Sequence, residues 1–436
     1  MLISKAIIND LSTAFVAAGG AFSVAIVDVD LDPLDFVRAA HGRAAPAVFF
    51  GRPGGVEIGA IGSAWEANAS AGTERLSRLA SQVPDVPGAK LVVGYSFSDD
   101  GPTREEWDAF GVARVVLPSA SVIRDDRSTR LVVVASAGEE QSVLSLLRDL
   151  RRPEARPRRH AAGRSIESVP APGDWMEAVA ETVAAIDEGA FEKVVMARSV
   201  IVTSDVASDP FDLADRLRSG YPGCFTYAWE SGGDSFVGAS PELLASVRGS
   251  RVISEPLAGT TARGEGDDHD RALGEQLMAS AKNRHEHRLV IDDIAARLGR
   301  IASDLRVPST PNLRRMANVQ HLSTHIAGTL RPEQGILDVV DALHPTPAVG
   351  GSPTADAIGM IGKMESIDRG WYAGGIGWLD AAGDGDVAVA LRCALLRGAT
   401  ARLFAGAGIV SGSVPQLELE ETRLKFGPML SLLTEA

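Results

Sequence analysis

The stretch FEKVVMARSV, residues 191–200, predicts one buried β-strand with a lysine at its entrance. Residues 194–197 are continuously apolar, and Val200, Ile201 and Val202 extend the run, which is typical of a strand buried on both faces. A solvated lysine at the strand end is the ordinary interpretation of Lys193, because lysine is rarely buried. The alternative is a buried lysine that loses its proton more easily and acts as a base.

Composition limits the class of protein. The chain has 436 residues, 45% of them hydrophobic, and a formal net charge of −14, which disfavours a nucleic-acid binder. Cys224 and Cys393 stand far apart and outside any metal-type spacing, so we expect free thiols in a reducing compartment, the cytoplasm. The absence of an apolar stretch of about 18 residues predicts no membrane span.

The chain divides at a basic connector. Residues 1–165 are rich in short apolar runs typical of strands, and the segment RRPEARPRRHAAGR, residues 151–164, predicts a solvated linker. Residues 166–436 alternate strand and helix patterns, with one long helix expected at 270–303 and one strand at 386–396. The pattern predicts a mixture of α and β elements with many strands.

The expected long helix carries a candidate metal ligand. His285 and His287 are two residues apart and face different directions, which excludes the zinc pattern of histidines at i and i+4. Glu286 lies one turn before Leu289 and Val290, so its carboxylate points toward the apolar face of the helix. An ion-paired structural glutamate is the alternative interpretation.

Two more acidic residues share a helix face near the C-terminus. Glu418, Glu421 and Lys425 follow each other at i, i+3 and i+7 in ELEETRLK, although a solvated Glu–Lys pair would show the same spacing. If these glutamates converge with Glu286, they must become protonated or hold a cation. Hard carboxylate oxygens suit magnesium.

Arg392 stands inside an apolar segment, VALRCALL, residues 389–396. A buried arginine needs an anionic partner, and the carboxylate of a ligand would serve through bidentate contact. The glycines of RLFAGAGIVSGS, Gly406 and Gly408, predict close approach of the backbone to a ligand or to another segment. The third glycine of a dinucleotide-binding loop is replaced by Ser411, which excludes that motif.

Ten motifs follow one another between residues 193 and 425. They are KVVMARS, GASPELL, EPLAGTTARG, AKNRHEHRLVIDDI, VQHLSTHIAG, HPTPAVGGSP, WYAGGIGW, ALRCALL, RLFAGAGIVSGS and ELEETRLK. In this order they resemble the motifs of the chorismate-utilising enzymes, which include isochorismate, salicylate, anthranilate and aminodeoxychorismate synthases. The resemblance implies an α+β fold with large antiparallel sheets flanked by helices and the site between them. It makes residues 1–165 the strand-rich N-terminal part of one fold unit and residues 166–436 the chorismate-binding region.

The resemblance also implies roles for single residues in a magnesium-dependent reaction on chorismate. Lys193 would be the general base that activates water, and Glu242 the general acid that protonates the leaving hydroxyl. Glu286 and Glu421 would bind magnesium, with Glu418 nearby through water. The expected substrate-binding residues are Gly259, Thr260, His321, Ala348, Tyr372, Leu391, Arg392, Gly406, Gly408 and Lys425.

Single positions favour one activity within the resembled family. Lysine at 193, where ammonia-using members have glutamine, favours water as the nucleophile and no glutaminase subunit. Ala258 stands where aminodeoxychorismate synthases have a nucleophilic lysine. Ala348 favours isochorismate synthases over salicylate synthases, which remain the alternative, as does a binder of an anionic metabolite that does not react. Tyr372 and Leu391 favour the menaquinone type over the siderophore type.

Two further expectations accompany these. Asn283 stands where many members of the resembled family have aspartate, which puts the outer shell of the metal site in question. We expect a monomer or a weak homodimer.

Overall fold

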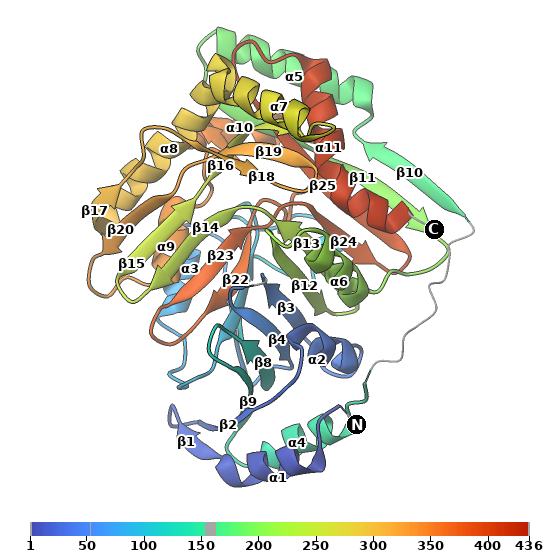
Figure 1. Ribbon diagram of the computed structural model, residues 1–436, viewed down its shortest axis with the longest axis vertical. Helices are drawn as coiled ribbons and strands as arrows, with labels where there is room; N and C mark the ends of the chain where they lie inside the picture. The colour runs from blue at the N-terminus through green and yellow to red at the C-terminus, as the bar shows by residue number, and fades with distance from the viewer. Residues whose placement is uncertain (1, 53, 153–162, 435–436) are drawn as a thin grey trace.

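The buried strand predicted around residue 195 is β11 (Lys193–Ser204), which lies near one edge of the largest sheet. The computed structural model describes residues 2–52, 54–152 and 163–434 (Figure 1). In these ranges the largest sheet has thirteen strands, and all of its pairs are antiparallel. In spatial order they are β1 (Val16–Ala18), β2 (Phe22–Asp28), β9 (Thr129–Ser136), β8 (Ala120–Arg124), β4 (Glu57–Ile61), β3 (Ala47–Gly51), β12 (Phe225–Ser231), β13 (Asp234–Ser240), β24 (Cys393–Arg397), β25 (Thr400–Ile409), β11 and β10 (Arg164–Val169), with β21 (Gly351–Ser352) paired to the start of β11.

Two smaller antiparallel sheets complete the strand framework of the described ranges. The second sheet runs β17 (Ala302–Arg306), β20 (Ile326–Leu330), β15 (Arg251–Glu255), β14 (Leu243–Arg248), β23 (Gly385–Val389), β22 (Gly375–Leu379), β6 (Leu91–Tyr95), β7 (Ala113–Leu117) and β5 (Trp65–Asn68). The third consists of β16 (Leu257–Ala262), β19 (Val319–Ser323) and β18 (Asn312–Arg315).

Helices flank these sheets, and several of them gather at one end of the molecule, the top of Figure 1, around β16, β19 and the start of β11. The helices are α1 (Lys5–Ala14), α2 (Pro33–Ala40), α3 (Arg75–Ala80), α4 (Glu140–Asp149), α5 (Pro172–Asp187), α6 (Pro210–Gly220), α7 (Asp267–Ala279), α8 (Ala281–Ile301), α9 (Ile336–Leu343), α10 (Thr354–Met364), α11 (Pro415–Thr434) and a 3₁₀ turn at Glu105–Trp107. The gathered helices α8 and α11 carry the glutamates that the sequence singled out.

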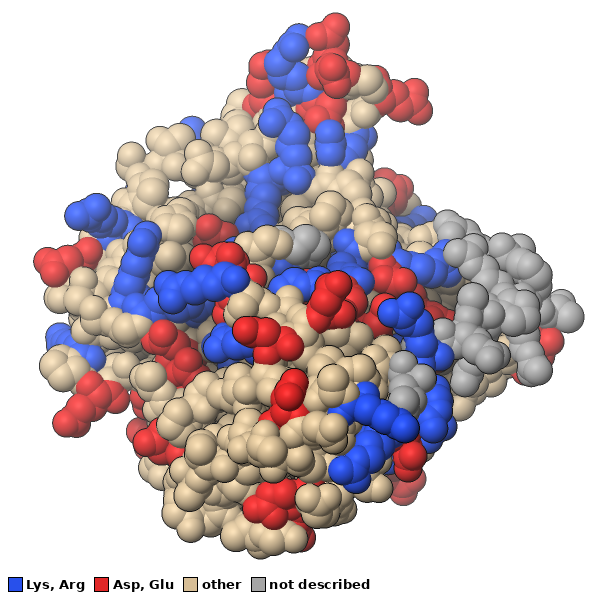
Figure 2. All heavy atoms as spheres, turned by 60° about the horizontal axis from the view of Figure 1, so that its bottom comes forward, with Lys and Arg blue, Asp and Glu red and all other residues tan. Residues whose placement is uncertain are grey.

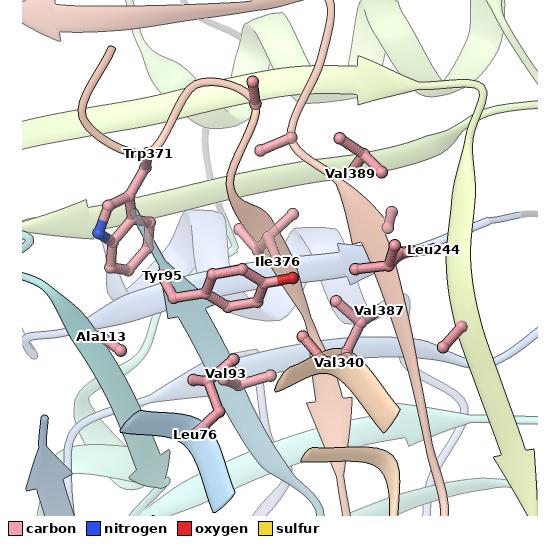
Figure 3. Close-up of a cluster of buried hydrophobic side chains, with 14 of the residues drawn as sticks. Leu76, Val93, Tyr95, Ala113, Leu244, Val340, Trp371, Ile376, Val387 and Val389 are labelled. Carbon is pink, nitrogen blue, oxygen red and sulfur yellow. The ribbon is translucent and has the colours of Figure 1, made fainter. Parts of the chain in front are cut away.

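Strands from before and after the connector pair with each other. β3 pairs with β12 in the first sheet, and β6 pairs with β22 in the second. One hydrophobic cluster likewise joins Tyr95 and Leu76 to Trp371 and Ile376 (Figure 3). The division at residue 165 stays a prediction, and most of the connector lies outside the described residues.

Two expected elements are each divided in the structure. The helix expected at 270–303 is α7 followed by α8, because Ser280 is extended and its hydroxyl accepts a hydrogen bond from the Asn283 amide as the N-cap of α8. The strand expected at 386–396 is β23 followed by β24, and Arg392 lies between them with a φ of +53°. Arg392 is therefore not inside a strand.

The surface carries both signs of charge close together. Over the face shown in Figure 2, lysine and arginine side chains are interspersed with aspartate and glutamate. Arg38 on α2 forms ion pairs with Asp35, Asp212 and Asp215. Among the helices of the described ranges, none is long and apolar enough to cross a membrane.

Candidate active site

The predicted site residues meet at a cleft of about 610 Å³ between helices α8 and α11, strands of the first and third sheets, and the segments that connect these elements. Thirteen of the fifteen predicted residues line it, and the two that do not are Lys193 and Glu418. Sequence reasoning missed seven lining residues as site members. Those seven are Val195, Pro241, Leu257, Ala258, Val349, Phe404 and Ala405.

Lys193 is the first residue of β11 and is completely buried. Its Nζ lies 2.9 Å from Oε1 of Glu286 on α8, yet it makes no hydrogen bond of ordinary geometry with any described residue. Gly408 on β25 leaves the room for this pair, since a Cβ atom there would come within 2.2 Å of Oε1 of Glu286. The buried lysine is thus charge-paired, and its capacity to donate hydrogen bonds is unused.

Glu242 follows β13 and precedes β14, and only 3% of its surface is exposed. Burial raises the pKa of Glu242 to about 7, against the opposing effects of the Leu257 amide and the positive charges of Lys193 and Arg392. A carboxyl group in this state can donate a proton near neutral pH. None of the ion pairs in the described ranges includes Glu242.

Arg392 faces the cleft together with a buried histidine. Nη2 of Arg392 lies 3.4 Å from Nε2 of His321, whose Nδ1 lies 3.3 Å from the Gly259 carbonyl and 3.1 Å from Oγ1 of Thr260. Burial and then the Arg392 charge hold the pKa of His321 well below its usual value. The imidazole is therefore neutral, with Nδ1 donating to the carbonyl and Nε2 accepting from Arg392.

The predicted metal-binding glutamates each contact a lysine. Glu286 pairs with Lys193, Oε1 of Glu418 lies 2.6 Å from Nζ of Lys282, and Oε1 of Glu421 lies 2.6 Å from Nζ of Lys425. Burial, and next the charge of Glu421, raise the pKa of Glu418, whereas Lys282 opposes that rise. The two glutamates on α11 are therefore close enough to repel each other.

The donor set suits a hard cation. Glu286 and Glu421 line the cleft with carboxylate oxygens, and magnesium in proteins usually takes one or two carboxylates together with ligand oxygens and waters. No group of three or more histidine, cysteine, aspartate or glutamate residues that could hold a metal ion exists in the described part of the chain. The residues thus fit a magnesium ion that shares its coordination with a ligand, and do not fit an all-protein cage.

The remaining lining residues include two stacked aromatic rings and Lys425. Tyr372 stacks on Phe404 with ring centroids 5.3 Å apart, and Lys425 donates to the Gly406 carbonyl at 2.8 Å. Phe404 and Ala405 stand two places and one place before Gly406 on β25, so the glycine motif could have indicated them. The lining role of Val349 had only its position beside Ala348 as a signal.

Comparison with known proteins fits this geometry. The family model described as "Chorismate binding enzyme" matches residues 19–434. The chain belongs to the chorismate binding enzyme family. A relative from Pseudomonas aeruginosa, "Salicylate biosynthesis isochorismate synthase", is 37% identical over 423 residues, covering 93% of this chain and 88% of that protein.

A second sequence relative and a solved structure are also similar to this chain. "Isochorismate synthase MenF" of Bacillus subtilis is 35% identical over 353 residues, covering 79% of this chain and 75% of that protein. The solved structure of the menaquinone-specific isochorismate synthase MenF from Escherichia coli superposes with a TM-score of 0.85 at 24% identity, covering 98% of this chain and all of the other. The chorismate binding enzyme fold, α+β with large antiparallel sheets flanked by helices, is as predicted.

Proposed function

We propose that this protein converts chorismate to isochorismate. Water adds at ring carbon two, the ring double bonds shift, and the 4-hydroxyl leaves as water, so the product is an isomer of the substrate. Water is a poor nucleophile and hydroxide a poor leaving group, so the reaction needs a base and an acid. The names of the two relatives that match most of the chain support this activity.

The observation that carries the proposal is the pair of buried groups Lys193 and Glu242. Lys193, in its neutral amine form and released from its contact with Glu286, would accept the proton of the attacking water on Nζ, which makes no hydrogen bond to a described residue. Glu242, with a pKa of about 7, would give its proton to the leaving hydroxyl. The proton that the base gains and the proton that the acid loses balance over the turnover.

We further propose that the two carboxylates of chorismate bind at opposite ends of the cleft. Arg392, Tyr372, Lys425 and the Gly406 backbone would hold the enolpyruvyl carboxylate, because Arg392 belongs to no ion pair in the described ranges and is free to bind an anion. Gly259, Thr260, His321, Ala348, Leu391 and Gly408 would line the ring.

The ring carboxylate would lie at Glu286 and Glu421, the residues that would hold magnesium, with Glu418 nearby. When bound, the ion supplies a positive charge that attracts this carboxylate and orients the ring. Binding of the ion by both glutamates would compete with their contacts to Lys193 and Lys425.

We place this chemistry in the cytoplasm, without a glutaminase subunit, in a chain that acts alone or as a weak homodimer. The buried free thiols Cys224 and Cys393 are compatible with a reducing compartment. The menaquinone-type assignment stays a prediction that rests on Tyr372 and Leu391.

Product analysis tests the proposal. The purified protein is incubated with chorismate and magnesium, and the products are separated by chromatography. We expect isochorismate with little pyruvate. Pyruvate and salicylate in equal amounts would instead make the protein a salicylate synthase, and saturable chorismate binding without turnover would make it a non-catalytic binder.

A further inference from the structure

The strand that begins with Lys193 has a gap in its outer edge just beyond that residue. Along its inner edge β11 pairs with β25 from Val194 to Thr203. On the outer edge β21 pairs with Lys193 and Val194, and β10 pairs from Ser199 onward. Between β21 and β10, no strand in the described ranges pairs with residues 195–198 on this edge. The Val195 amide donates a hydrogen bond to the Gly350 carbonyl, which precedes β21.

Two buried side chains fill this gap. Nη2 of Arg369 donates to the Val195 carbonyl at 2.7 Å, and the Ala197 amide donates to Oε1 of Glu365 at 2.7 Å. The two side chains bind each other through Arg369 Nε to Glu365 Oε2 at 2.8 Å and Nη2 to Oε1 at 2.5 Å. Together they supply the donor and the acceptor that a neighbouring strand would supply.

The same guanidinium reaches a second segment of the cleft wall. Nη1 of Arg369 donates to the Val349 carbonyl at 2.8 Å, so one side chain holds the carbonyls of two lining residues, Val195 and Val349. The carbonyl of Arg369 itself accepts from the amide of Tyr372, another lining residue, at 2.9 Å. The side chains of Arg369 and Glu365 are only 4% and 3% exposed, so water does not compete for these bonds.

We infer that Glu365 and Arg369 are positioning residues for the reaction. Neither is among the residues that line the cleft, and they act by fixing the backbone two and four residues after Lys193 together with the walls at Val349 and Tyr372. The inference rests on the proposed function, because it assigns to this pair the placement of the proposed base. Since a misplacement of about 1 Å can cost about 10²-fold in rate, the pair should matter for turnover more than for binding.

The test compares Arg369→Lys with Arg114→Lys. Arg114 is a matched control: it also forms a bidentate pair with a glutamate, Glu66, at 3.0 and 3.1 Å, and it donates to a backbone carbonyl, that of Ala109. None of these partners lines the cleft. Lysine keeps the positive charge in both variants but loses the planar fork. Steady-state kinetics with chorismate and denaturant unfolding are measured for each.

For Arg369→Lys we expect a fall in kcat of about 10²-fold with KM changed less than about threefold. For Arg114→Lys we expect a similar loss of stability and kcat within about twofold of the wild type. Equal kcat for the two variants would overturn the inference. Absence of turnover in the wild type would instead overturn the proposed function, and the two failures are therefore distinct.

A second variant and a second measurement cover the case in which Arg369→Lys does not fold. Glu365→Gln has the same shape and keeps an oxygen that can accept from the Ala197 amide, so we expect a folded protein with kcat lowered about tenfold. Hydrogen exchange of the amides around Ala197 should accelerate in this variant and stay unchanged in Glu66→Gln. Unchanged exchange and unchanged kcat in Glu365→Gln would contradict the positioning role.

Discussion

On the helical wall of the cleft, α8 and α11, each of the glutamates Glu286, Glu418 and Glu421 contacts a lysine within 3 Å. On the strand wall, which carries Glu242, His321 and Arg392, no ion pair of the described ranges involves any of these residues. On the helical wall each of these carboxylates contacts a lysine, whereas the strand wall carries a guanidinium without an ion-pair partner and a carboxyl group whose pKa is raised to about 7. A ligand with two negative charges would therefore meet an unpaired positive charge at Arg392 on the strand wall. On the helical wall, a cation that binds the glutamates would have to replace their lysine partners.

The largest expected effect follows from Lys193, the residue that neutralises Glu286. Lys193→Ala should lower the rate of isochorismate formation by about 10⁴-fold, since general base catalysis contributes up to that factor. Chorismate affinity, measured by calorimetry, should change little. If affinity and fold are lost together, as judged by circular dichroism, Lys193 has a structural role only.

Glu242→Gln tests the strand wall, whose carboxyl group has no ion-pair partner in the described ranges. We expect about 10³-fold lower kcat, because the amide cannot supply the proton. The free energy of unfolding, in contrast to kcat, should increase in this variant above neutral pH. The folded protein holds this proton more tightly than the unfolded chain, with a pKa raised from 4.5 to about 7, so folding becomes less favourable as pH rises between these values.

The amide variant escapes this penalty. Above pH 7 it should be more stable than the wild type by up to about 3 kcal/mol, and at pH 4 the two should be equal. Urea unfolding at both pH values measures the difference. Equal stability at pH 8 would show that Glu242 is ionised without cost, which contradicts its role as the acid.

Arg392→Lys sharpens the claim that the guanidinium is free for a ligand. The variant keeps the charge and loses bidentate geometry, so we expect KM for chorismate to rise about 30-fold, equivalent to about 2 kcal/mol, with kcat reduced less. The pH dependence of KM should keep its shape. An unchanged KM would mean that the substrate carboxylate binds elsewhere.

The pH profile of the wild type gives a smaller effect. Because the pKa of Glu242 is about 7, kcat/KM should fall about tenfold per pH unit on the alkaline side of neutrality, as the acid loses its proton. The decline is measured with chorismate and magnesium at saturating metal. A profile that stays flat to pH 9 would contradict the assignment of the acid.

The smallest effect is expected on the helical wall, where lysines contact the glutamates. Lys282 is 37% exposed and contacts the buried Glu418, so Lys282→Gln removes a cation that competes with magnesium. We expect half-saturation at about threefold lower magnesium, in line with the modest strength of exposed ion pairs. Lys90→Gln, far along the chain and paired with Asp380, is the control that should leave the magnesium titration unchanged.

The sequence predicted the fold and most of the lining residues because the ordered motifs carry both. It offered the Glu421–Lys425 pair as an alternative, but it did not predict that Lys193 contacts Glu286 or that Lys282 contacts Glu418, since these lysines come from different segments than their glutamates. Glu365 and Arg369 have the i, i+4 spacing of a solvated helix pair, yet α10 ends at Met364 and both side chains turn into the interior. The burial of Glu365 and Arg369 results from tertiary contacts with β11, which a local sequence pattern does not encode.

The interruption between β23 and β24 at Arg392 could not be predicted from the sequence, for a different reason. Its neighbours have the composition of a strand, and a positive φ at an arginine leaves no mark in the sequence. The break between α7 and α8 could have been predicted, because Ser280 is a typical N-cap residue before a helical run.

The pairing of β3 with β12 has a consequence for how the chain is made. During synthesis β3 emerges more than 170 residues before its partner, and β6 waits still longer for β22. At about 5–20 residues per second, the nascent protein exposes these strand edges for about ten seconds or more. Until then these strands lack the partners that cover their edges in the folded protein, and a fragment that stops before Phe225 should aggregate.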